Sequence, residues 1–265
     1  MNQCIESLSP IAPAEQLSKE TRPKVALALG AGGALGCAHI GVIRALEQLG
    51  VEIKAVAGSS MGALVAAFLA EEKLAQLEAF LRKTNARTML GYMNFPRKSP
   101  GIVSSEKLDD LLRGALGDVT IEEMKMPYAA MAMEWGTWDS IVLNTGDLVE
   151  SVVISSSIPL IFSRKKHKGR TVVDGGFSSL VPLPAIRQLS KEKVVAVGVA
   201  RGAPIIRWAR RKYAERQWRN DRPELDIFLE LEKGAVRYDQ AQEFIDAGYK
   251  FIMNRREPIL QALAA

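Results

Sequence analysis

A serine between two glycines is the first group in this sequence whose type and spacing could carry covalent chemistry. The apolar run from Val51 to Ala57 predicts a buried strand, and Gly58-Ser59-Ser60-Met61-Gly62 follows it. The small residues that come next predict a buried helix, and a strand turning sharply into a helix around Gly-x-Ser-x-Gly lifts the serine hydroxyl clear of the sheet. N–H groups at the helix N-terminus would favour a developing negative charge there. Ser60 is therefore a candidate nucleophile, and the alternative is a serine that only caps a helix.

A glycine-rich loop follows the first predicted strand, Lys24 to Leu29, and precedes a predicted helix that ends at Gly50. Strand, glycine loop and helix also open a dinucleotide-binding fold, but its Gly-x-Gly-x-x-Gly spacing fails here because Leu35 or Ala31 falls on a required glycine. The pair Gly32-Gly33 remains, with N–H groups that no side chain covers. Such a loop binds an anion, and the oxyanion of an acyl-transfer intermediate is one candidate.

A serine nucleophile needs a base, and the sequence contains only two histidines. His39 lies about one turn into the helix after the glycine loop, where we expect it to be packed or to cap. His167 lies in a charged, hairpin-like turn, Arg164 to Arg170, where we expect it to be solvated. The order serine, acid, histidine of an α/β-hydrolase needs a later histidine, and none follows residue 167. A carboxylate is the expected base.

Asp174 is the candidate carboxylate. It ends a short apolar strand, Thr171 to Val173, and Gly175-Gly176 follows it without side-chain bulk. By itself Asp-Gly-Gly is an ordinary turn. Beside Ser60 and the Gly32-Gly33 pair, it could instead converge with them at the strand ends where α/β folds place their sites.

At these residues the sequence resembles the patatin-like phospholipases, and in particular the compact bacterial branch related to the neuropathy target esterase catalytic domain. The resemblance runs from about Lys24 to Val199, with further similarity around Ala241 to Gly248. Three ordered segments carry it: GAGGALGCAHIGV from Gly30, GSSMG from Gly58, and SSSIPLIFSRKKHKGRTVVDGG from Ser155.

The resemblance implies ester hydrolysis on lipids by a Ser–Asp dyad, without histidine, metal or cofactor. Ser60 would be the nucleophile and Asp174 the general base, and the N–H groups of Gly32 and Gly33 would form the oxyanion hole. The remaining motif glycines would be Gly30, Gly36, Gly58, Gly62, Gly175 and Gly176.

Two positions of the glycine loop depart from the family pattern. Leu35 stands where the family usually has Arg or Lys, and Ala31 stands where Gly or Ser is common. Backbone donors survive both changes, so we still expect an oxyanion hole. Leu35 is nevertheless the reason to carry an alternative: a catalytically weak or silent patatin-like protein that binds lipid or regulates.

Composition is that of an ordinary globular protein. The 265 residues are 48% hydrophobic and 25% charged, and the net charge is +5. Cys4 and Cys37 are too few for a disulfide framework, and no Cys/His cluster has metal-ligand spacing. Residues 1–22 lack a positive stretch followed by an apolar one, so we expect no signal peptide, and without an uninterrupted apolar run of about 18 residues we expect no bilayer-spanning segment. We expect a cytoplasmic protein.

Strands that alternate with helices predict an α/β fold, with a parallel-type central sheet between helices in the three-layer, patatin-like arrangement. We expect a loose arm over residues 1–22 and a single domain over 23–265. Val194 to Val199 is the last predicted strand, and the chain from about residue 204 is predicted to be helical and charged. The irregular segment Thr84 to Gly101 is a candidate acyl-chain entrance or, equally, a satellite of the core.

The segment from Arg201 to Arg222 is strongly basic and carries interleaved aromatic residues. Such a helix could lie on an anionic membrane at the inner surface, whereas we see no nucleic-acid recognition motif. A solvated helix face paired with the acidic stretch from Glu224 to Glu232 is the alternative, and the sequence favours it slightly. The expected partners are phospholipid, lysophospholipid or another fatty-acyl ester, and the expected membrane contacts are Arg207, Trp208, Arg210, Arg211 and Trp218.

Overall fold

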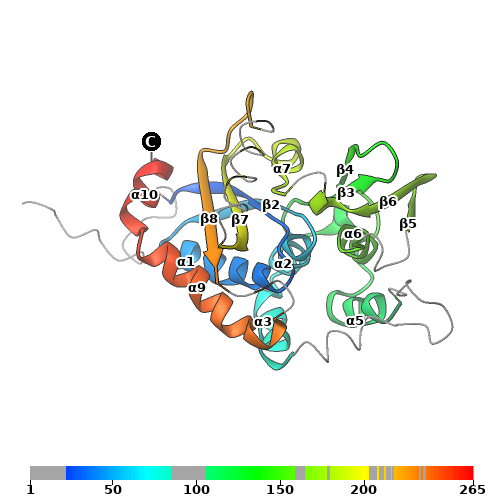
Figure 1. The fold of residues 1–265 in the computed structure, drawn as a ribbon, viewed down its shortest axis with the longest axis horizontal. Coiled ribbons are helices and arrows are strands. Elements are labelled where there is room, and N and C mark those ends of the chain that lie inside the picture. The colour runs from blue at the N-terminus through cyan, green and yellow to red at the C-terminus, as the bar shows by residue number, and fades with distance from the viewer. Residues whose placement is uncertain are drawn as a thin grey trace, which may run out of the picture.

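The computed structural model describes residues 22–84, 106–158, 165–177, 180–202, 218–232 and 237–264, and the single residues 208, 212, 216 and 234. Its centre is an eight-stranded sheet in the order β5-β6-β3-β2-β1-β7-β8, with β4 paired to β3 (Figure 1). The strands are β1 (Lys24–Leu29), β2 (Glu52–Gly58), β3 (Tyr128–Glu134), β4 (Ser140–Leu143), β5 (Lys165–His167), β6 (Arg170–Asp174), β7 (Lys193–Arg201) and β8 (Leu225–Leu231).

Helices cover both faces of this sheet. Figure 1 shows α7 on one side of the strands and α1, α2, α3 and α9 on the other. The described helices are α1 (Ala38–Gln48), α2 (Met61–Ala70), α3 (Leu74–Lys83), α5 (Glu106–Leu116), α6 (Leu148–Ser155), α7 (Leu183–Leu189), α9 (Ala241–Met253) and α10 (Arg256–Ala264). The predicted α/β fold with helices on both faces of the sheet is confirmed.

The alternation of side chains along the buried strands explains the two faces. On β1, Val25, Leu27 and Leu29 belong to the large cluster beneath α1, α2 and α9, whereas Ala26 and Ala28 belong to a smaller cluster with α7. Successive strand residues point to opposite faces. A face made mostly of alanine lets the short helix α7 pack closely on the sheet.

The strand β6 runs opposite to its neighbours, and its register decides where it ends. β1, β2, β3, β7 and β8 are parallel, whereas β4 and β6 are both antiparallel to β3. Gly58 of β2 pairs with Ala130 of β3, and Asp174 of β6 pairs with Ala132. Because β4 pairs with both of these alanines along the other edge of β3, β2 and β6 share one edge and meet end to end.

The prediction that the chain after Pro204 is helical is wrong at β8. Leu225, Ile227, Leu229 and Leu231 recur at every second position, and β8 pairs in parallel with β7. Asp226 and Glu230 point outward from this half-buried strand. This alternation of buried and exposed side chains, with a period of two, is typical of a strand and not of a helix. The acidic stretch from Glu224 to Glu232 therefore lies largely on a strand and not in the helical region that we expected.

One expected membrane contact is also wrong. Trp218 is only 6% exposed and lies in the cluster beneath α7, with Leu183 and Ile186. Trp208 is 59% exposed, while Arg207, Arg210 and Arg211 lie outside the described residues. The segment Thr84 to Gly101 also lies outside them, except for Thr84, which is buried.

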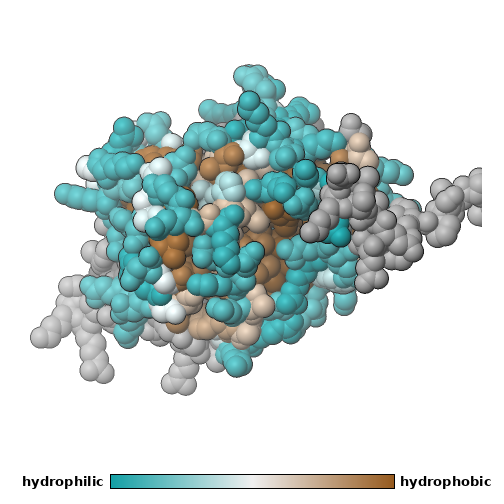
Figure 2. Space-filling model, turned by 180° about the vertical axis from the view of Figure 1, so that it is seen from behind, coloured by the Kyte–Doolittle hydropathy of each residue, from teal (hydrophilic) through white to brown (hydrophobic). Residues whose placement is uncertain are grey.

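Figure 2 shows the face opposite to that of Figure 1, where hydrophilic side chains cover most of the surface and hydrophobic ones appear in patches between them. Among the described residues, the large hydrophobic side chains that are clearly exposed are Trp138, Leu180 and Trp208. No helix in the described ranges is both long enough and apolar enough to cross a bilayer.

Candidate active site

Ser60 lies between the end of β2 and the start of α2 in a conformation that few residues adopt. Its φ is 54° and its ψ is −122°, a combination that costs on the order of 1–3 kcal/mol and persists only where neighbours enforce it. The flanking glycines make the turn possible. A Cβ on Gly58 would lie 2.2 Å from the Gly62 carbonyl oxygen, and a Cβ on Gly62 would lie 2.2 Å from that of Leu29.

The end of α6 fixes both sides of the predicted dyad. The backbone N–H of Ser60 donates to Ser155 Oγ at 3.0 Å, and the backbone N–H of Asp174 donates to the Ser157 carbonyl oxygen at 2.9 Å. Sequence reasoning quoted this serine run only as part of a family motif and gave it no role. The available signal was a run of three serines at the end of a mostly apolar helix.

Asp174 comes to Ser60 because β6 meets β2 end to end. The two side chains are hydrogen-bonded, and the Gly176 N–H donates to Asp174 Oδ1 at 2.7 Å. Asp174 is only 3% exposed, and this burial raises the pKa of its carboxyl from 3.8 to about 6, against the opposing effect of the two hydrogen bonds. The carboxylate is therefore ionised at neutral pH yet basic enough to accept a proton.

The glycine loop is anchored to neighbouring backbone. Gly30 N–H donates to the Val197 carbonyl oxygen at 2.8 Å, and Ala31 N–H donates to that of Leu180 at 3.0 Å. Gly33 has a φ of 54°, in the left-handed region that favours glycine, and it lines the same cavity as Ser60. None of the described residues accepts a hydrogen bond from the N–H of Gly32 or Gly33. Their role as oxyanion donors stays a prediction.

His39 holds this loop and is not placed as a base. It is fully buried, and its Nε2 lies 2.8 Å from the Gly30 carbonyl oxygen. Burial lowers the pKa of its imidazole to about 4, so the ring is neutral and Nε2–H is the donor. The prediction of a packed histidine is confirmed. His167 lies on β5 and lines a different cavity, with Asp147 and Glu150.

Leu35 is part of the core. It is 3% exposed and packs in the large cluster beneath α1 and α2. The bonds of Gly30, Ala31 and His39 hold the loop without a basic side chain at this position. The nearby thiol of Cys37 is buried, and its pKa is raised to about 12 by that burial, so it does not compete with Ser60 as a nucleophile.

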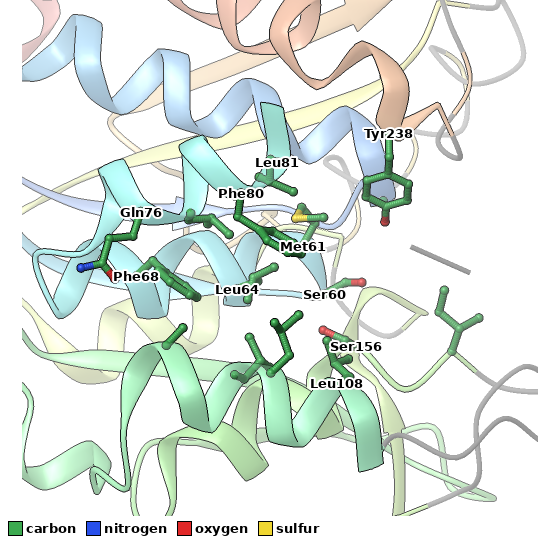
Figure 3. A pocket seen from close by; sticks show the side chains of 16 residues that line it. Ser60, Met61, Leu64, Phe68, Gln76, Phe80, Leu81, Leu108, Ser156 and Tyr238 are labelled. Carbon is green, nitrogen blue, oxygen red and sulfur yellow. The ribbon is translucent and has the colours of Figure 1, made fainter. Parts of the chain in front are cut away.

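An apolar cavity of about 200 Å³ begins at Ser60 and runs between α2, α3 and α5 (Figure 3). Gly33, Ser156, Ile158 and Tyr238 also contribute to its lining, and Figure 3 places Ser156 and Tyr238 at the serine end. Sequence reasoning missed Tyr238, which lies in the C-terminal part of the chain. The apolar lining consists of Met61, Leu64, Phe68, Leu77, Phe80, Leu81, Leu108, Leu111, Leu112 and Ala115.

Comparison with known proteins gives a consistent picture. The family model described as patatin-like phospholipase matches residues 27–186. An uncharacterised NTE family protein of Mycobacterium tuberculosis is 34% identical over 190 residues, which are 72% of this chain and 53% of that protein. The human patatin-like phospholipase domain-containing protein 6 is 28% identical over 185 residues, which are 66% of this chain and 13% of that protein. The chain thus spans about half the length of the mycobacterial relative.

Among solved structures, VipD from Legionella pneumophila matches with a TM-score of 0.53 and 17% identity, over 91% of this chain and 66% of that one. At this identity the likeness concerns the fold alone. The described residues contain no cluster of three or more His, Cys, Asp or Glu side chains that could hold a metal ion.

Proposed function

Because the chain belongs to the patatin-like phospholipase family, we propose that it is a serine acyl hydrolase that cleaves lipid esters, of the phospholipase A or lysophospholipase type. One observation carries the proposal: the strained Ser60 is hydrogen-bonded to the buried carboxylate of Asp174 and opens onto an apolar cavity. A fatty-acyl ester needs such an environment, with a nucleophile and base at one end and apolar walls beyond.

In the proposed reaction, Ser60 Oγ attacks the ester carbonyl carbon while Asp174 accepts the hydroxyl proton. The carbonyl oxygen becomes an oxyanion that the N–H groups of Gly32 and Gly33 stabilise. Collapse of this intermediate breaks the bond to the alcohol, which leaves with the proton from Asp174. The acyl group is then attached to Ser60 Oγ. Asp174 next deprotonates a water that attacks the acyl carbon, and it returns that proton to Ser60 Oγ as the fatty acid leaves.

The elbow and the register of β6 favour this reaction over a silent, lipid-binding protein. A purely binding protein would need the cavity but neither the strained conformation of Ser60 nor a buried carboxylate bonded to its hydroxyl. The silent alternative rests on Leu35, and the loop is anchored without a basic residue there.

A fluorophosphonate probe tests the proposal. The wild-type protein should be labelled and should hydrolyse a lysophospholipid, whereas Ser60→Ala should do neither. Ser140→Ala, which changes an exposed serine on β4, serves as the matched control and should behave as wild type. Absence of Ser60-dependent labelling together with absence of ester turnover would refute the hydrolase and leave the lipid-binding alternative.

A further inference from the structure

The cavity beside Ser60 extends along α2. Met61, Leu64 and Phe68 follow one another on the same side of this helix, and Figure 3 shows them extending in this order away from Ser60. Their spacing of three and four residues places them on one helix face. Leu77 and Leu81 of α3 and three leucines of α5 form the opposite walls. The cavity is therefore an apolar channel that is parallel to α2.

The chemistry of the lining changes at the far end of this channel. Gln76, at the start of α3, is the polar residue that lines the cavity beside Phe68 in Figure 3. Gln76 is exposed, whereas Phe68 is only 3% exposed. The methylene groups of a bound acyl chain would therefore be removed from water between Ser60 and Phe68, whereas those that extend beyond Gln76 would be exposed to water.

The length of the apolar part follows from helix geometry. Phe68 lies eight residues after Ser60, and a helix rises about 1.5 Å per residue, so the walls extend roughly 12 Å. A fully extended chain advances roughly 1.2 Å per bond, as the span of an extended backbone shows. About ten carbons of an acyl chain therefore fit between the ester carbonyl and the Phe68–Gln76 end.

We propose that this channel takes a single acyl chain along α2 and recognises about its first ten carbons, with Phe68 and Gln76 as its end. This proposal rests on the proposed function, since it assigns the acyl group of the same ester to the channel. Each methylene that becomes buried should raise kcat/KM by about fourfold, and methylenes beyond the end should add nothing. The substrate class is then an ester with an acyl chain of about ten carbons or more, and one chain is bound at a time.

The test measures kcat/KM for monomeric p-nitrophenyl esters with acyl chains of four to sixteen carbons. For the wild type we expect a steep rise that levels off near ten carbons. Leu64→Trp should block the channel four residues from Ser60 and move the break to about five carbons. Gln76→Leu extends the apolar wall from an exposed position and should move the break to longer chains.

A control variant and a second readout make the outcome decisive. Gln188→Leu changes an exposed glutamine on α7, on the other side of the sheet, and should keep the wild-type profile. Binding of free fatty acids of six to sixteen carbons to Ser60→Ala, followed by fluorescence, should show the same break without any turnover. A break in binding without esterase activity would refute the hydrolase but support the channel. A smooth rise to sixteen carbons, or an unchanged break in both channel variants, would refute the channel.

Discussion

Replacing Asp174 by asparagine should remove activity and at the same time stabilise the folded protein at neutral pH. The carboxylate is 3% exposed, and its pKa is raised from 3.8 to about 6 because burial penalises the charged form. A folded-state pKa above the unfolded value means that the folded protein binds the proton more tightly. Stability from this group is therefore greatest below pH 4 and is lost as pH rises through 6.

The size of this effect follows from the two pKa values. Because the pKa of Asp174 is raised from 3.8 to about 6, its ionisation lowers the free energy of unfolding by about 3 kcal/mol at pH values well above 6. An asparagine side chain at this position is neutral and similar in shape, and its carbonyl oxygen can still accept the Gly176 N–H. We expect Asp174→Asn to gain up to about 3 kcal/mol at pH 8 while its kcat falls by roughly 10²–10⁴ with the loss of the base.

Urea denaturation at pH 8 and at pH 4.5 measures the gain, and hydrolysis of a short ester measures the loss. The stability difference between wild type and Asp174→Asn should shrink toward zero on acidification, as the wild-type carboxyl becomes protonated. Comparing the two proteins cancels the titration of His39, whose lowered pKa acts equally in both. Asp139→Asn, at an exposed aspartate, serves as the matched Asp-to-Asn control. A variant that is less stable than wild type at pH 8, or a difference that does not depend on pH, would refute the reasoning.

Four further outcomes are expected. In the wild type, kcat/KM should fall about tenfold per pH unit below pH 6, because Asp174 must be ionised; a flat profile down to pH 4.5 would contradict its role as base. Gly33→Ala, at a φ of 54°, should shift the loop and lower kcat by about 10²–10³ with little change in KM, and a pure KM effect would argue against an oxyanion donor. Ser155→Ala removes the acceptor of the Ser60 N–H and should cost about 1 kcal/mol in urea denaturation as well as part of kcat; unchanged kcat would leave this serine a structural role only. Trp208, Lys212 and Arg216 are helical and exposed, so Arg216→Ala should weaken flotation with anionic vesicles but not with neutral ones, and equal wild-type binding to both would exclude electrostatic docking.

The parts of the site that the sequence predicts are those that local chemistry determines. Gly58 and Gly62 predict the sharp turn at Ser60, since a side chain at either position would clash with backbone atoms. The count of two histidines directs attention to a carboxylate, and the buried, neutral His39 agrees with that reasoning. In each case the deciding interaction lies within a few residues of the motif or depends on composition alone.

The parts that the sequence does not predict depend on pairing between distant segments. Trp218 lies in a basic, aromatic segment whose composition is typical of a membrane anchor. It is nevertheless buried, because α7 and the alanine-rich face of the sheet leave room for its ring. The strand β8 lies among charged residues, and only its period of two distinguishes it from the helical pattern around it. The channel requires α2, α3 and α5 to face one another, and no single segment carries that information.

The contact between Ser60 and Asp174 combines both kinds of information. Sequence reasoning placed the two residues at neighbouring ends of a parallel sheet, yet β6 is antiparallel to β3 and approaches from the opposite direction. The two residues meet because, along one edge of β3, the last residue of β2 pairs with Ala130 and the last residue of β6 pairs with Ala132. A slip of β6 by one residue would reverse the face to which Asp174 points. The Ser157 carbonyl oxygen and the close fit of Gly175 against Met131 oppose that slip, so the glycine after Asp174 fixes the register that brings the carboxylate to the serine.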